Sequence, residues 1–189
     1  MISSFSKFFA KEAAKKVPFG RKALPGVSRI IMTASCKGGV GKSTVGKELA
    51  NRLEYQFIDL DLYIEKLMNK SIPDIFSEYG EDFFREMEKK ALVDMKELEN
   101  VIVACGGGII KDKTNKELME GTKIYLTAPI EFISERINNS EIDRPLMSKY
   151  TIKDLLIKRE ELYNYFKDIE VMNINIDDTI NSILQSVGE

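Results

Sequence analysis

The chain of 189 residues contains no histidine. This absence excludes catalytic triads built on histidine and zinc sites with histidine ligands, so acid–base chemistry must fall to aspartate, glutamate, lysine or tyrosine. Only two cysteines occur, Cys36 and Cys105, and they indicate no disulfide framework. No apolar run approaches the ~20 residues of a membrane-spanning helix, so we expect no membrane span.

The remaining composition is ordinary for a single globular domain, with 43 % hydrophobic and 31 % charged residues. The net charge of −2 is unevenly spread: residues 1–29 hold seven basic side chains and one acidic one. We interpret residues 1–28 as a basic N-terminal extension and linker, and residues 29–189 as the domain. We expect a cytoplasmic protein, or a plastid or mitochondrial one if the extension is a transit peptide.

From Ile30 onward, apolar β-branched runs alternate with runs of helical spacing, which is typical of a parallel α/β sheet. Predicted strands cover residues 29–34, 56–58, 101–104, 123–126 and 169–172. Predicted helices cover residues 44–53, a segment from about 60, 72–98 with a break near Gly80, a segment from Pro129, 151–166 and 178–187. The polar segment 138–150 is typical of a lid. Ligands of such sheets bind at the carboxyl ends of the strands.

The segment from Ser35 to Thr44 reads SCKGGVGKST and predicts a phosphate-binding loop between a strand and a helix. In such a loop the backbone N–H groups point inward and the helix N-terminus adds partial positive charge. Lys42 would reach the β- and γ-phosphates of a nucleotide, and the Ser43 hydroxyl would hold Mg²⁺. The predicted nucleotide-binding residues of this loop are Gly38, Gly39, Val40, Gly41, Lys42, Ser43 and Thr44.

Two carboxylates, Asp59 and Asp61, stand at the end of the second predicted strand. Asp59 would serve the magnesium ion directly or through water. Asp61 would accept the proton of a substrate hydroxyl or hydrogen-bond that hydroxyl into line. The alternative for either residue alone is that it caps the following helix.

Three arginines and a glycine triplet complete the candidate site. Gly106, Gly107 and Gly108 follow a buried strand and would let the backbone approach a ligand closely. Arg85 shares a helix face with Glu88, and a surface ion pair is the alternative interpretation of that pair. Arg144 lies in the lid-like segment, and Arg159 lies on the helix after it.

These motifs occur in an order and at spacings that resemble the shikimate kinase family. They are GKSTVG, FIDLD, SIPDIF, FFREME, the glycine triplet, RPL and KREELY, from about Gly41 to the C-terminus. The resemblance implies a three-layer P-loop kinase fold, with helices on both faces of a five-stranded parallel sheet. It also implies transfer of the γ-phosphate of ATP to the 3-hydroxyl of shikimate, with Mg²⁺, in the pathway to chorismate and aromatic amino acids. We expect a monomer that binds ATP and shikimate, and neither nucleic acid nor membrane.

By the same resemblance, Asp61, Arg85, the glycine triplet and Arg159 would hold shikimate. Asp61 would activate its hydroxyl, and the two arginines would clamp its carboxylate. Lys42, Asp61 and Arg144 are the implied catalytic residues. Arg144 would contact the transferring phosphate, and Arg136 would lie near the adenine.

Residues 25–44 instead resemble the deviant-P-loop ATPases, in which Lys37 would reach the nucleotide of a partner subunit. A dimeric ATPase and a kinase of the gluconate type are therefore alternative functions. A separate hypothesis concerns Cys36 and Cys105, which follow two strands that the implied fold makes neighbours. A reversible disulfide there would inhibit the kinase, and two small buried residues without redox role are the alternative.

Overall fold

The computed structural model describes residues 29–34, 40–129, 131–133 and 152–188, with side chains omitted at residues 34, 152–156 and 158. Within these ranges, one five-stranded sheet has the order β2-β3-β1-β4-β5, and every pair of neighbouring strands is parallel. The strands are β1 (Arg29–Ala34), β2 (Gln56–Asp59), β3 (Val101–Ala104), β4 (Thr122–Thr127) and β5 (Ile169–Met172). The predicted parallel sheet is confirmed. Its order places the carboxyl ends of β1, β2 and β3 side by side.

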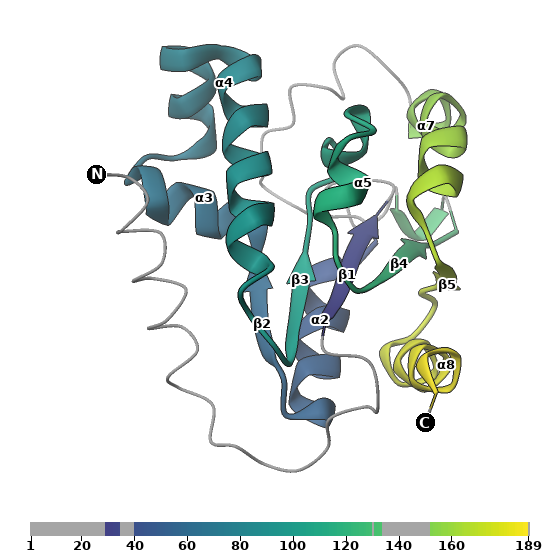
Figure 1. Ribbon diagram of the computed structural model, residues 1–189. Coiled ribbons are helices and arrows are strands. Elements are labelled where there is room, and N and C mark those ends of the chain that lie inside the picture. The colour runs from purple at the N-terminus through teal and green to yellow at the C-terminus, as the bar shows by residue number, and fades with distance from the viewer. Residues whose placement is uncertain (1–28, 35–39, 130, 134–151, 189) are drawn as a thin grey trace.

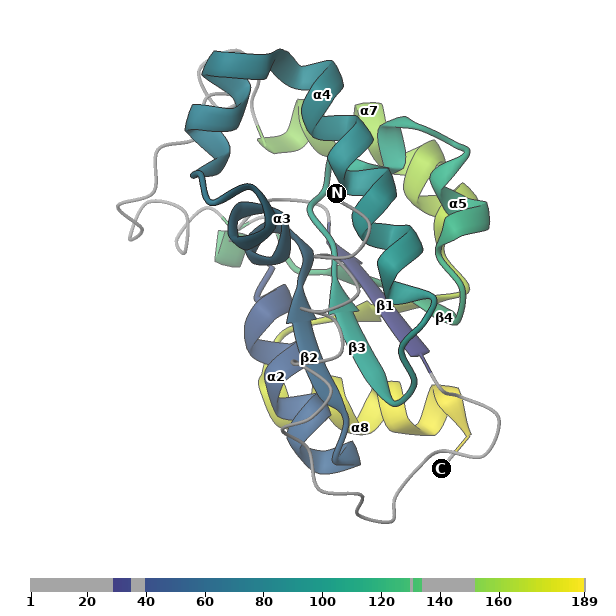
Figure 2. The same ribbon diagram turned by 60° about the vertical axis from the view of Figure 1, so that its left-hand side comes forward.

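Helices cover both faces of this sheet, which confirms the three-layer arrangement (Figures 1 and 2). One face packs against α2 (Lys42–Leu53) and α8 (Ile176–Val187). The other face packs against α4 (Ile72–Met95), α5 (Asn115–Leu118) and α7 (Ile152–Phe166), with α3 (Leu60–Met68) beside α4. A 3₁₀ turn, Ile109–Lys111, precedes α5. Among the described residues, no helix has the length and apolar character needed to cross a bilayer.

The central strand shows why the sequence folds into three layers. Ile30 and Met32 point to the core beneath α2 and α8, whereas Ile31 points to the core beneath α4. All three side chains are at most 1 % exposed. Successive side chains of a strand alternate between its faces, so a continuous apolar run must be covered on both sides.

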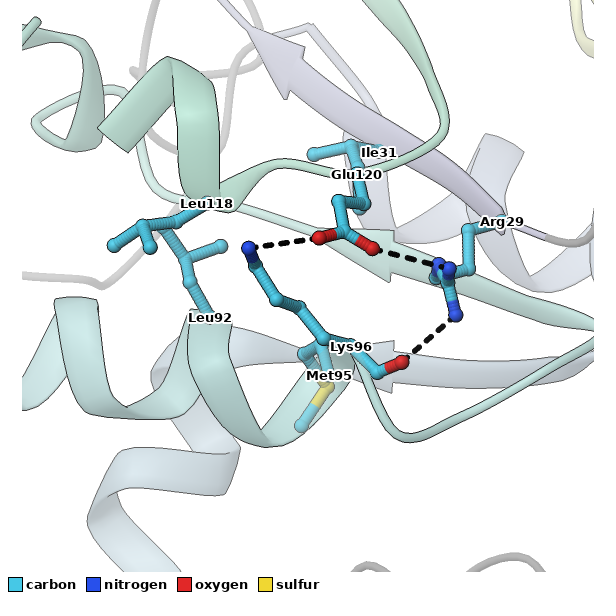
Figure 3. Close-up of a pocket in the computed structure, with 7 residues that line it drawn as sticks. All are labelled: Arg29, Ile31, Leu92, Met95, Lys96, Leu118 and Glu120. Atoms are coloured by element: carbon cyan, nitrogen blue, oxygen red, sulfur yellow. Dashed lines mark hydrogen bonds and ion pairs between the residues drawn. The ribbon is translucent and has the colours of Figure 1, made fainter. Parts of the chain in front are cut away.

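Arg29, the first residue of β1, binds the amino end of that strand to the segment that follows α4 (Figure 3). Its guanidinium donates hydrogen bonds to the carbonyl oxygens of Lys96 (2.9 Å) and Leu98 (2.7 Å), just after α4. It also pairs with Glu120 (3.3 Å), which is shared with the ammonium of Lys96 (2.8 Å). The small pocket among these side chains lies at the amino end of β1, away from the loops in which ligands of such sheets bind.

Most predicted boundaries are confirmed within one or two residues, and the break in α4 falls at Gly80 as expected (φ 83°). The three largest differences are that α2 and α8 each begin two residues earlier than predicted and that α4 ends at Met95 rather than at residue 98. The 3₁₀ turn and α5 were not predicted. The N-terminal extension 1–28 and the lid segment 138–150 lie outside the described residues, so both stay predictions.

Candidate functional site

The phosphate loop enters α2 through Gly41. This residue has φ 81° and ψ 20°, a left-handed conformation that glycine adopts without steric cost. Its carbonyl accepts the first helical hydrogen bond, from the N–H of Val45 (2.9 Å). Val40 is fully buried beside it. Gly38 and Gly39, like Cys36 and Lys37, lie outside the described residues.

Lys42, Ser43 and Asp59 form a compact cluster where the loop meets β2. The Ser43 hydroxyl donates to Asp59 Oδ2 at 2.8 Å, and Lys42 Nζ lies 3.4 Å from the same oxygen. The side chains of Lys42 and Asp59 are only 14 % and 13 % exposed, so their ion pair is shielded from solvent. Thr44, the last residue of the predicted loop, is exposed on the first turn of α2.

Asp59 uses its second oxygen to cap α3. Its Oδ1 accepts a hydrogen bond from the backbone N–H of Asp61 (3.2 Å), which satisfies one of the free donors at the helix start. The capping alternative is therefore confirmed for Asp59, which also contacts the phosphate loop through its other oxygen, and its role as a magnesium ligand stays a prediction. The cap also fixes the first turn of α3, which carries Asp61.

Asp61 and Arg85 both lie against the glycine triplet. A Cβ atom on Gly106 would stand 3.1 Å from Asp61 Oδ1. On Gly108, a Cβ atom would stand 2.5 Å from Arg85 Nη1 and 2.7 Å from Nη2, a separation that real side chains do not tolerate. An alanine at position 108 would therefore force the end of the Arg85 side chain to shift away from the backbone.

Arg159 reaches the middle of the triplet from the far side of the site. Its Nη1 donates to the carbonyl oxygen of Gly107 at 3.0 Å, and the hydroxyl of Tyr163, one helical turn along α7, lies 3.4 Å from the same oxygen. The triplet is thus the place where side chains from α3, α4 and α7 meet. Arg136 and Arg144 lie outside the described residues.

Arg85 is held by two carboxylates. Nη1 lies 2.5 Å from Glu88 Oε2, and Nη2 lies 2.8 Å from Glu81 Oε1. The ion pair of the alternative interpretation is therefore present, but Glu88 is only 1 % exposed, so the pair does not lie on the surface. Burial raises the pKa of Glu88 to about 7, although the neighbouring charge of Arg85 favours the carboxylate.

Glu81 joins a second cation to this cluster. Lys111 Nζ lies 2.7 Å from Glu81 Oε1, and hydrogen bonds from Lys111 and Arg85 lower the pKa of Glu81 to about 2. Neither Glu81 nor Lys111 was predicted to belong to the site. The spacing of Glu81 and Arg85, four residues apart on α4, is the signal that could have identified the first of them.

Cys105 is a free, fully buried thiol that follows β3. Burial raises the pKa of this thiol well above its usual range, which disfavours the reactive thiolate. The pairing of β1 with β3 is confirmed. Cys36 lies outside the described residues, so the proposed disulfide stays a prediction.

Asn173 is a further polar side chain at this edge that sequence reasoning missed. It is 2 % exposed and donates a hydrogen bond to the carbonyl oxygen of Val40 in the phosphate loop (2.6 Å). The alternation of side chains along β5 could have identified it, because Val171 faces inward and the side chain two residues later should face inward as well.

These groups form two adjoining parts of one site. The first part consists of Lys42, Ser43 and Asp59. It offers a cation, a hydroxyl and a carboxylate beside a helix N-terminus, which suits a phosphate with its metal ion. The second, Asp61, Arg85 and Arg159 around the triplet, offers a carboxylate for a hydroxyl and two guanidinium groups for an anion.

Comparisons with known proteins agree with this geometry. The model of the family described as shikimate kinase matches residues 38–187. The chain is 43 % identical over 129 residues to the shikimate kinase of Persephonella marina, covering 66 % of this chain and 78 % of that protein. It is 41 % identical over 140 residues to the bifunctional shikimate kinase/3-dehydroquinate synthase of Thermotoga maritima, covering 72 % of this chain but only 28 % of that protein.

A solved structure gives the same result at the level of the fold. The shikimate kinase from Acinetobacter baumannii in complex with shikimate superposes with a TM-score of 0.77 at 30 % sequence identity. The superposition covers 88 % of this chain and 96 % of that one.

Proposed function

The chain belongs to the shikimate kinase family, and from this premise we propose that its glycine triplet, Asp61, Arg85 and Arg159 bind shikimate beside an ATP held by the phosphate loop. The enzyme is an ATP-dependent kinase that transfers the γ-phosphate of ATP to the 3-hydroxyl of shikimate. This reaction leads to chorismate and the aromatic amino acids.

One observation carries the assignment of the shikimate site. Three side chains from three different helices converge on the triplet: Asp61 against Gly106, Arg159 on the carbonyl of Gly107, and Arg85 against Gly108. Shikimate carries both a carboxylate and neighbouring hydroxyl groups. Two guanidinium groups and a carboxylate are the complementary set.

Each residue has a distinct role in this proposal. Arg85 and Arg159 hold the carboxylate of shikimate and so fix the position of its ring. Asp61 accepts a hydrogen bond from the 3-hydroxyl and orients it toward the γ-phosphate, and it can take the proton as the new bond forms. Lys42 stabilises the negative charge that spreads over the phosphate oxygens during transfer.

We also propose that Ser43 and Asp59 hold the Mg²⁺ that accompanies ATP. Their oxygens, 2.8 Å apart, are hard ligands of the kind that Mg²⁺ prefers, and this ion is usually held by few protein groups together with water and phosphates. The bound ion would neutralise phosphate charge. Asp59 also pairs with Lys42 at 3.4 Å, so the lysine stands beside the residues that would hold the ion.

We further propose that the kinase acts as a cytoplasmic monomer. The groups from Ser43 and Asp59 to the glycine triplet belong to one chain, so the two parts of the site described above do not require a partner subunit. Light scattering during size-exclusion chromatography tests the monomer. A dimer that forms only with nucleotide would instead favour the deviant-P-loop interpretation of Lys37.

A coupled assay of ADP release tests the function against its alternatives. ADP should appear with ATP, Mg²⁺ and shikimate together, and only at background level without an acceptor. Gluconate in place of shikimate should give background as well. Equal turnover with gluconate, or ADP release that needs no acceptor, would refute the assignment in favour of the gluconate-type kinase or the ATPase.

A further inference from the structure

Asn173 connects the end of β5 to the phosphate loop through contacts that are removed from solvent. Its amide nitrogen donates to the carbonyl oxygen of Val40 at 2.6 Å, across 133 positions of sequence. Asn173 and Thr179 are 2 % and 1 % exposed, and Val40 is fully buried. A buried polar side chain is costly unless its hydrogen bonds are made, so this contact calls for a specific explanation.

The orientation of the amide follows from its partners. The carbonyl oxygen of Val40 can only accept, so the NH₂ group of Asn173 must face it and the amide oxygen must face the other way. There the hydroxyl of Thr179 lies 3.0 Å from Asn173 Oδ1 and 2.6 Å from the carbonyl oxygen of Asn175, so the two oxygens share its single hydrogen. The backbone N–H of Asn173 is bonded to the carbonyl oxygen of Thr127 in β4 (2.8 Å), so the residue is fixed at both its main chain and its side chain.

The Val40 contact sets the direction of the next peptide group. In a trans peptide the carbonyl and the following N–H point in opposite directions, and the described residues contain no cis peptide. With the Val40 carbonyl directed at Asn173, the N–H of Gly41 is directed away from it. Gly41 is also the residue whose left-handed conformation starts α2.

We propose that Asn173 is a positioning residue of the nucleotide site, which holds the Val40–Gly41 peptide so that the Gly41 N–H faces the phosphates of ATP. The inference rests on the proposed function. Without the amide, this peptide can rotate, and the loop loses part of its preorganisation for an anion. Because Asn173 contacts the loop and not the triplet, its loss acts on ATP and not on shikimate.

Asn173→Ala tests this inference through the separation of two Michaelis constants. We expect the KM for ATP and the dissociation constant of ADP, measured by calorimetry, to rise about tenfold, with the KM for shikimate within about twofold of the wild type. Met95→Ala is the control: Met95 is buried at the end of α4, in the core on the other face of the sheet, so it should lower the melting temperature without changing either constant.

The outcomes are separable. Wild-type affinity for ADP in folded Asn173→Ala, or an equal rise in both Michaelis constants, would overturn the inference. If that variant does not fold, Asn173→Asp decides: a carboxylate of the same shape cannot donate to the Val40 carbonyl, so ADP should bind about tenfold more weakly, and unchanged binding would overturn the inference. Failure of the proposed function would differ, since the wild type itself would then show no shikimate-dependent turnover.

Discussion

Gly108→Ala should disable the shikimate site while leaving the nucleotide site intact. The new Cβ atom would stand 2.5 Å from Arg85 Nη1 and 2.9 Å from its Cζ. Ordinary contacts require about 3.5 Å, so the guanidinium must retreat by about 1 Å. Glu88 opposes that movement because its buried carboxylate pairs with Nη1 at 2.5 Å. A displacement of about 1 Å in a group that positions a substrate costs about 10²-fold in rate.

The coupled kinase assay measures this loss. We expect kcat/KM for shikimate to fall about 10²-fold in Gly108→Ala, with the KM for ATP nearly unchanged. The same change in an Arg85→Ala background should cost less than about twofold more, because the clashing group is then absent. A variant with a wild-type KM for shikimate, or losses that simply multiply in the double variant, would refute the reasoning.

Three further predictions concern other parts of the site. Asp61→Asn should lower kcat by about 10²–10⁴-fold at nearly unchanged KM for ATP. The control variant Asp82→Asn, on the exposed surface of α4, should have no effect. Near-normal turnover of Asp61→Asn would contradict the proposed role of Asp61. Lys42→Ala should lower kcat at least about 10²-fold, since a shielded cation beside the phosphates is lost, and activity within tenfold of wild type would be inconsistent with this. Burial raises the pKa of Glu88 from 4.5 to about 7, so between these pH values Glu88 keeps its proton in the folded protein and loses it in the unfolded chain. The free energy of unfolding should therefore fall by up to about 3 kcal/mol as pH rises through this interval. Urea unfolding from pH 4 to pH 8 should show a shallower decline in Glu88→Gln, and identical pH dependence of the two proteins would count against the raised pKa.

The strands and the phosphate loop could be predicted from the sequence because their signals are local. The apolar run of β1 needs cover on both faces, and Gly41 to Thr44 has the composition of an anion-binding loop. The start of α2 was predicted two residues late because Gly41 caps the helix without a side-chain hydrogen bond, so no Ser, Thr, Asp or Asn marks it. The 3₁₀ turn and α5 are too short to show a periodic pattern.

Two features of the site, the burial of Glu88 and the contact of Asn173, depend on contacts between distant segments. The alternative interpretation of Arg85 and Glu88 as a surface pair rested on their local spacing, whereas the burial of Glu88 comes from packing in the core beside α4. Asn173 contacts Val40 across most of the chain. Spacing along one helix can suggest which side chains share a face. It does not show how deeply that face is buried or which carbonyl group of a distant segment lies opposite it.

Phosphorus NMR of the reaction product tests the central claim most directly, because it reports the atom that receives the phosphate. After incubation of the full chain with ATP, Mg²⁺ and shikimate, we predict a new phosphate ester whose phosphorus couples to the proton on carbon 3 of the ring. The Asp61→Asn variant should leave that signal absent over the same time. A product phosphorylated at another hydroxyl, or inorganic phosphate alone, would contradict the account.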